Sequence, residues 1–267
     1  MLSRILMMMP KAPAAWSQSA LWPLGTEARA WYEPSLLNGT LFQDAAGTQP
    51  VTAIGQPVGL MLDRSGQGNH ATQVTASKRP LLQQDGGGLY YLDFDGLDDA
   101  MVTGSVNFTS TDKVTMVTGL RRRGTSTGVL LEMSSNFNSN SAFAAFAPIS
   151  GNSVYFVTQA GGGIYSSAQL SDVAAPSLGV FAFAADRALA TNEVSIRKNG
   201  VAATTGRAEN SNTSGNYGNH PLYIGGRGGS SLFFNGALYG LIVVGAAPSA
   251  GEIANAETFM NIRTGAF

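Results

Sequence analysis

The sequence predicts an all-β sandwich or barrel, and three observations support this fold class. Roughly ten short strand-like runs follow one another from Leu89 onward, at intervals of about 8–12 residues. Charged residues make up only 12% of the chain, about half of the usual ~25%, while 33 glycines and 11 prolines supply many turns. The tripeptide Lys198-Asn199-Gly200 predicts a hairpin, because Asn-Gly readily adopts the positive φ angles of a type I′ turn.

The composition excludes several classes of function. There are 16 Lys and Arg against 17 Asp and Glu, so we expect no nucleic-acid binding driven by net charge. The absence of cysteine excludes disulfide scaffolds and thiolate zinc sites, and two histidines leave little for metal catalysis. The longest apolar run, residues 238–247, is far shorter than the ~20 residues of a membrane span, so we expect no membrane insertion.

Residues 1–29 predict an extended N-terminal arm. The segment carries three prolines and four methionines and has no sustained helical or strand period. An apolar arm is unfavourable in water, so we expect it to lie against its own domain, a sister subunit or a larger assembly. Trp16 and Trp22 are the candidate assembly residues.

The body of the chain predicts strands in a regular series. The expected ranges are 89–94, 100–103, 113–121, 128–133, 142–147, 153–159, 178–185, 193–198, 201–204, 222–224 and 237–244. The only basic cluster, Arg121-Arg122-Arg123, falls on one of these strands, where alternate residues point to opposite faces. We therefore expect a solvated edge or a subunit contact there and no basic patch.

One helix is predicted, at the C-terminal end. Ser249 and Glu252 form a capping box, and Ile253, Ala256 and Met260 fall on one face. Gly265 can end the helix.

Three groups of segments resemble known proteins. Trp31-Tyr-Glu-Pro-Ser35 and the stretches at residues 41–48 and 58–72 resemble the leader before concanavalin A-like jelly rolls in tailed-phage and prophage structural proteins. Residues 79–80 and 91–99 resemble the first core strand and turn of laminin-G-like domains, and residues 222–226, 234–243 and 248–253 resemble their last strands and closing helix. The resemblance implies a two-sheet antiparallel jelly-roll sandwich over residues 30–267, with a leader at 30–80, the N-terminal arm and a short C-terminal helix.

The densest chemical feature is Asp93-Phe-Asp-Gly-Leu-Asp-Asp99. Asp95, Asp98 and Asp99 surround a glycine turn, so their oxygens can converge on a hard cation, and calcium is the one cofactor that we consider. The alternative is that these side chains accept backbone hydrogen bonds within the turn.

Aromatic rings in loops are candidate sugar platforms. Tyr165, Tyr217 and His220 lie in Gly-, Asn- and Ser-rich segments expected to be loops, where binding groups tend to sit. The alternative is that Tyr217 and His220 only order the loop at residues 208–219.

An enzymatic function is not expected. The glucanases that share the resembled fold carry Glu-x-Asp-x-x-Glu on one strand face, and none of the seven glutamates here is followed two positions later by Asp. A carboxylate pair from distant strands is not excluded by this argument.

The resemblance implies a virion structural protein: a tail, fibre, baseplate or capsid-surface component carrying a lectin-like jelly roll. Its partners would be other virion proteins through the arm, further copies of itself and a host-surface glycan, and its place the virion, assembled in the bacterial cytoplasm. The alternatives are a carbohydrate-binding host-recognition module and a glycoside hydrolase.

Overall fold

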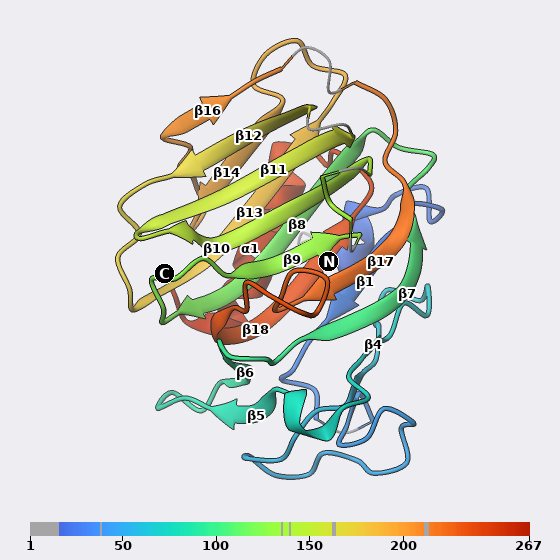
Figure 1. The fold of residues 1–267 in the computed structure, drawn as a ribbon, viewed down its shortest axis with the longest axis vertical. Helices are drawn as coiled ribbons and strands as arrows, with labels where there is room; N and C mark the ends of the chain where they lie inside the picture. The colour runs from blue at the N-terminus through green and yellow to red at the C-terminus, as the bar shows by residue number, and fades with distance from the viewer. Residues whose placement is uncertain (1–15, 38, 135, 139, 162–163, 211–213) are drawn as a thin grey trace, which may run out of the picture.

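The fold is a sandwich of two antiparallel sheets with one helix on the outside (Figure 1). The computed structural model describes residues 16–37, 39–134, 136–138, 140–161, 164–210 and 214–267. The predicted fold class is confirmed over these ranges, while residues 1–15 of the predicted arm lie outside them.

Sheet A carries the C-terminal helix. Its strand order is β15 (Val201–Ala202), β14 (Val194–Lys198), β13 (Ser177–Asp186), β8 (Lys113–Arg122), β18 (Asn235–Val244), β6 (Tyr90–Asp95) and β5 (Leu81–Gln84), and β1 (Arg29–Tyr32) also pairs with β18. One edge of β18 is shared, because its first half pairs with β6 and its second half with β1. Strand β1, at the start of the leader, therefore belongs to sheet A.

Sheet B forms the other layer and lies in front in Figure 1. Its order is β16 (Gly206–Ala208), β12 (Ile164–Leu170), β11 (Ser153–Gly161), β10 (Ala142–Ser150), β9 (Val129–Met133), β17 (Asn219–Ile224), β7 (Met101–Asn107), β4 (Ala71–Thr72), β3 (Leu60–Met61) and β2 (Leu41–Phe42). The main core lies between the sheets, where Phe156 of sheet B packs 5.4 Å from Phe183 of sheet A, measured between ring centroids.

Several strands lie outside the expected ranges, namely β1 to β5, β12 and β16. β12 was expected to be a loop because it is rich in serine, yet it pairs with β11 on one side and β16 on the other. Its inward positions are Ser166, Ala168 and Leu170, which are small or apolar enough to be buried. His220 was also expected in a loop and lies in β17, opposite Val106.

The predicted hairpin and helix are confirmed. Asn199 and Gly200 both have positive φ, 51° and 82°, between β14 and β15. Helix α1 (Ala250–Thr264) begins where the Ser249 hydroxyl accepts the Glu252 N–H and ends at Gly265 in the left-handed conformation. The 3-10 helices are η1 (Gln18–Leu21) and η2 (Ala76–Lys78). Among the described residues, no helix combines the length and the apolar character needed to cross a bilayer.

A second apolar cluster joins α1 and the N-terminal segment to the outer face of sheet A. Met260 of α1 packs there with Val117, Ile242 and the side chains of Leu21 and Trp22. The helix can lie close to the sheet because Gly119 has no side chain. A Cβ at this position would collide with Thr264 and Met260. Residues 16–29 thus belong to the packed domain.

The arginine cluster lies at the end of β8, which is a central strand and not an edge, and its middle residue is buried. Arg122 is fully buried and its guanidinium donates to the carbonyl oxygens of Gly151 and Val173 and to Asn152. Alternate residues of β8 point toward the core, and Arg122 is one of them. Its side chain therefore lies between the sheets, next to the turn that joins β10 to β11. Arg122 therefore ties sheet A to the β10–β11 hairpin.

Candidate functional site

The acidic turn after β6 brings three carboxylates together. Ligand oxygens of Asp95, Asp98 and Asp99 all lie within 4.8 Å of one another. Gly96 makes the turn possible, since its φ is +77° and a Cβ would collide with Asn235. The convergence expected from the sequence is present.

Backbone hydrogen bonds also hold this turn. Asp95 Oδ1 accepts the N–H groups of Leu97 (2.7 Å) and Asp98 (3.3 Å), and Asp99 Oδ2 accepts the Asp95 N–H (3.0 Å). Asp93 does not join the cluster, because it forms a close ion pair with Arg123. Both sequence-based interpretations, a cation site and a self-satisfied turn, are therefore compatible with the geometry.

The electrostatics of the turn favour a cation. Asp99 is only 6% exposed, and burial raises its pKa to about 6, with the negative charges of Asp95, Asp98 and Asp93 adding to the shift. Asp93, Asp95 and Asp99 border a cleft of about 240 Å³ that Ser77 and Arg79 also line. Hard oxygen donors of this kind suit calcium, which would relieve the like-charge repulsion, and calcium binding stays a prediction.

The outer face of sheet B carries two adjoining hollows. The first, of about 150 Å³, is lined by Phe137, Asn138, Phe146, Tyr155, Val157, Gln159 and Tyr165. The second, of about 300 Å³, is lined by Tyr155, Ser167, Gln169, Gly206, Arg207 and Ala208. Tyr155 belongs to both, so the two hollows form one groove across β10, β11, β12 and β16, which we call the sheet B groove.

Strand alternation explains why these side chains gather. The register pairs Tyr155 with Phe146 on one side and with Gln169 on the other, and it pairs Gln159 with Tyr165. Directly opposite residues share a face of the sheet, so all of these side chains point outward. Phe156, the next residue along β11, points inward to the core.

The three residues predicted to bind a glycan are not brought together. Tyr165 is 45% exposed and lines the sheet B groove. Tyr217 is only 2% exposed, its hydroxyl lies 2.8 Å from Thr158 Oγ1, and its ring contacts Phe143 and Arg187. The expectation for Tyr217 is corrected, since a buried ring cannot stack on a sugar, and half-buried His220 lines neither hollow.

Sequence reasoning missed Tyr155 and Phe146. Their ring centroids lie 6.0 Å apart in an edge-on arrangement. Burial raises the pKa of the Tyr155 hydroxyl, which is hydrogen-bonded to Ser167. The rough alternation of aromatic residues in this part of the sequence was the available signal, but it does not tell which face is outward.

A buried glutamate, Glu132, is held in an ion pair whose arginine lies over two rings of the groove lining. Glu132 on β9 is fully buried and accepts a 2.8 Å hydrogen bond from Arg227 Nε, and the Arg227 guanidinium lies over the rings of Phe137 and Phe146. Burial raises the Glu132 pKa while Arg227 opposes the shift. Among the described residues no carboxylate lines either hollow, so no pair of carboxyl groups for glycoside hydrolysis faces the groove.

The predicted assembly residues pack against their own domain. The Trp16 indole N–H donates to Glu252 Oε2 at 2.6 Å, and its ring lies 5.7 Å from that of Phe259 on α1. Trp22 is 8% exposed and lies under the Arg29 guanidinium. Packing on the own domain was one of the expected outcomes; a role in assembly stays a prediction.

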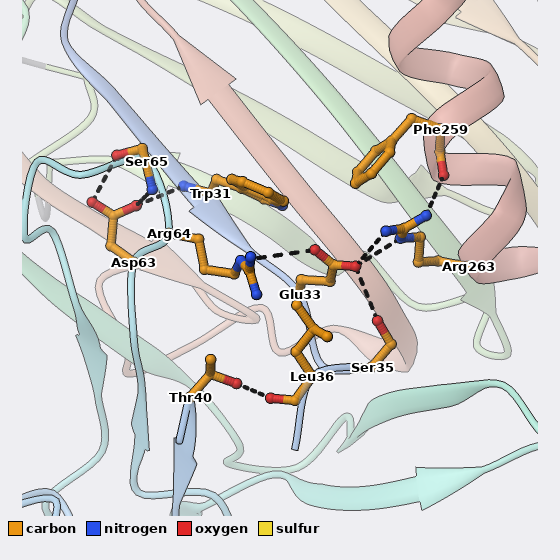
Figure 2. A network of polar contacts seen from close by, with 10 residues as sticks. All are labelled: Trp31, Glu33, Ser35, Leu36, Thr40, Asp63, Arg64, Ser65, Phe259 and Arg263. Atoms are coloured by element: carbon orange, nitrogen blue, oxygen red, sulfur yellow. Dashed lines mark hydrogen bonds and ion pairs between the residues drawn. The ribbon is translucent and has the colours of Figure 1, made fainter. Parts of the chain in front are cut away.

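A polar network joins the leader to α1 (Figure 2). Glu33 is 3% exposed and accepts a 2.8 Å hydrogen bond from Arg263 Nε, while Arg64 approaches it from the leader at 3.9 Å. Each arginine also covers a ring, Arg263 that of Phe259 and Arg64 that of Trp31. Both arginines therefore contact Glu33 and an aromatic ring, and this network holds the leader against α1.

Comparison with known proteins identifies the fold. No family model and no curated protein sequence matches the chain. Among solved structures, the binding domain of botulinum neurotoxin serotype D aligns with a TM-score of 0.59 and 8% identity, over 92% of this chain and 54% of that chain. A structure of botulinum neurotoxin type C, described as dependent on interaction with two ganglioside molecules for cell entry, aligns with a TM-score of 0.53 and 10% identity. The alignment covers 75% of this chain and 49% of that chain.

The receptor binding domain of botulinum neurotoxin D aligns similarly, with a TM-score of 0.56 and 8% identity over 76% of this chain and 50% of that one. The chain therefore spans about half the length of these neurotoxin domains. At such identities the likeness shows the sandwich fold and carries no function by itself.

Proposed function

We propose that the chain is a lectin-like binding module whose sheet B groove takes a short, uncharged oligosaccharide of a cell surface. The observation that carries this proposal is the meeting of two hollows at Tyr155, with the half-exposed Tyr165 ring beside it. Rings offer stacking faces for pyranose sugars, and the side chains of Asn138 and Gln169 supply amide groups for hydroxyls.

The shape and charge of the groove define the ligand class. A ligand that spans both hollows must extend over more than one sugar ring, because Tyr155 stands between them. Among the described lining residues Arg207 alone is charged, and its guanidinium donates to the Val194 carbonyl oxygen. The groove therefore suits neutral sugars. The neurotoxin neighbours named for receptor or ganglioside interaction support surface binding as a class of function.

A glycan array tests the proposal. We expect the full chain to bind neutral oligosaccharides and Tyr165→Ala to weaken binding about fivefold, as expected for a lost stacking contact worth about 1 kcal/mol. Phe267→Ala removes another exposed aromatic ring, 53% exposed, that lines neither hollow, and serves as the matched control. Equal binding by both variants, or no binding by the full chain, would contradict the proposal.

We propose in addition that the module belongs to a tailed-phage or prophage virion, as a tail, fibre, baseplate or capsid-surface component. The support is the resemblance of the leader segments, together with the integration of β1 into sheet A, which makes leader and sandwich one unit. In this proposal residues 1–15 connect the module to other virion proteins. Removing these residues keeps Trp16, Leu21 and Trp22 in place, so the domain should fold but fail to co-purify with particles. Normal incorporation of the shortened chain would contradict this role.

We propose that the module is not a glycosidase, because the described lining of the groove holds no carboxylate. Incubation of the full chain with the best array ligand should leave the oligosaccharide intact by mass spectrometry. Cleavage that survives Tyr165→Ala and is lost in Glu132→Gln would overturn this assignment.

A further inference from the structure

A buried carboxylate lies on the outer face of sheet B beside the sheet B groove. Glu132 of β9 is directly opposite Ala144 of β10, and Ala144 is two residues before Phe146, whose ring lines the groove. Side chains that are directly opposite or two residues apart share a face, so Glu132 points outward with Phe146. Yet Glu132 is fully buried, and its Oε1 has no hydrogen-bond partner among the described residues. Burying a charge costs free energy unless a partner of opposite charge contacts it.

The partner of this carboxylate is Arg227. Its Nε donates to Glu132 Oε2 at 2.8 Å, and its guanidinium carbon lies 5.4 Å from the ring centroid of Phe146 and 5.6 Å from that of Phe137. Both rings line the first hollow of the groove, and β9 is the strand next to β10. The guanidinium therefore lies at the end of the sheet B groove that is nearest to β9.

The backbone around Arg227 is a tight turn between β17 and β18. The Arg227 N–H donates to the Ser231 carbonyl oxygen at 2.7 Å, and the Arg227 carbonyl oxygen accepts the Ser231 N–H at 3.3 Å. Gly229, within this turn, has a positive φ of 66°, and a Cβ there would lie 3.6 Å from the ring of Tyr223. Tyr223 is directly opposite Glu132, so the turn lies over the outer face of sheet B and holds the backbone of the arginine there.

The guanidinium keeps donors for a ligand. The Arg227 side chain is 32% exposed, and within the part of the chain that the structure describes its only side-chain hydrogen bond comes from Nε. The remaining N–H groups of the planar fork belong to the two terminal nitrogens, Nη1 and Nη2. Hydroxyl and ring oxygens of sugars accept hydrogen bonds from such groups. Because the Glu132 carboxylate compensates the positive charge, the pair offers donors without a net charge.

We propose that Arg227 forms a third subsite of the sheet B groove, where its terminal nitrogens donate to oxygens of an uncharged sugar unit next to the first hollow. Glu132 is the positioning residue of this subsite, because it holds Nε and cancels the charge that would otherwise attract an acidic sugar. The inference rests on the proposed function and extends it to a residue pair that lines neither hollow.

Titration calorimetry of the full chain with the best neutral oligosaccharide from the array tests the donor role. We expect Arg227→Met to weaken binding about tenfold, as for the loss of a hydrogen bond from a charged donor. Arg227→Lys keeps the charge beside Glu132 but lacks the fork, so it should bind about threefold more weakly than the unaltered chain. The lysine variant carries the test if urea unfolding shows that the methionine variant is not folded.

A matched control comes from a similar ion pair elsewhere in the fold. Arg197 of β14 lies 2.9 Å from the fully buried Glu257 of α1 and lines neither hollow. Arg197→Met therefore removes an arginine from a buried glutamate without touching the groove. It should leave the affinity for the oligosaccharide unchanged.

Glu132→Gln tests the positioning role through ligand selectivity, which a merely structural residue would not change. The amide keeps an oxygen for Arg227 Nε, but the arginine then carries an uncompensated charge. The second probe is the same oligosaccharide with its terminal primary alcohol oxidised to a carboxylate. We expect Glu132→Gln to shift the affinity ratio about fivefold toward this acidic probe, as for a partly exposed ion pair. Glu257→Gln should leave the ratio unchanged.

The outcomes separate this subsite from the proposed function. Unchanged binding by both Arg227 variants, an equal loss in Arg197→Met, or an unchanged ratio in Glu132→Gln would overturn the subsite. If Tyr165→Ala still weakens binding in that case, the proposed function stands without it. No binding of any oligosaccharide by the unaltered chain would overturn both.

Discussion

Replacing Asp99 with Asn should stabilise the protein at neutral pH. In the folded chain the pKa of Asp99 is raised to about 6, whereas an Asp in an unfolded chain titrates near 3.9. A carboxyl whose pKa is raised on folding binds its proton more tightly in the folded state, so stability is highest below about pH 4 and falls as the pH rises through about 6. A shift of about two pH units corresponds to about 3 kcal/mol lost at pH 7.

The variant Asp99→Asn removes this cost and keeps an oxygen that can accept the Asp95 N–H. Urea unfolding in the presence of EDTA should therefore show a gain of up to about 3 kcal/mol at pH 7, or about 5 °C in Tm for a chain of this length, and no gain at pH 4. Asp98→Asn removes one of the negative charges that raise the pKa of Asp99, so it should give a smaller gain at pH 7. A variant that is less stable at pH 7, or equally changed at both pH values, would refute the reasoning.

Four further outcomes follow from the same structure. Millimolar calcium should raise the Tm of the full chain at pH 7 by binding only the folded state, and Asp98→Asn should abolish the rise; equal Tm values with calcium and with EDTA would rule out the site. Arg122→Met should cost about 3 kcal/mol in urea unfolding, because the carbonyl groups of Gly151 and Val173, the second of them buried, lose their donor. Ser249→Ala should cost about 1 kcal/mol through loss of the helix cap, with an unchanged Tm speaking against the cap. Gly119→Ala should cost about 1–3 kcal/mol in urea unfolding, since the new methyl group pushes α1 from sheet A.

Features set by neighbours in the sequence could be predicted. Ser249, Glu252 and Gly265 mark the ends of α1 through contacts made within a few residues, and Asn199-Gly200 determines its own turn. The convergence of Asp95, Asp98 and Asp99 is local in the same way, because a single glycine turn produces it.

Features set by distant pairing could not be predicted. The burial of Tyr217 depends on Thr158 and Arg187, which other strands contribute. Tyr165 was expected in a loop and lies on β12, and its neighbour Tyr155 is recognised only once the register of β11 and β12 shows which residues share the outer face. The serine-rich β12 is stabilised as a strand by its two partners, a tertiary effect that outweighs its weak local preference.

The central claim is that the outer face of sheet B binds a neutral oligosaccharide. Hydrogen exchange of the full chain, measured with and without the best ligand from the array, tests it most directly because it reports the location of binding. The account predicts slower exchange in β11 and β12 around Tyr155 and Tyr165, and no change in the acidic turn at Asp95 to Asp99. Protection confined to the acidic turn or to α1, with β11 and β12 unchanged, would contradict it.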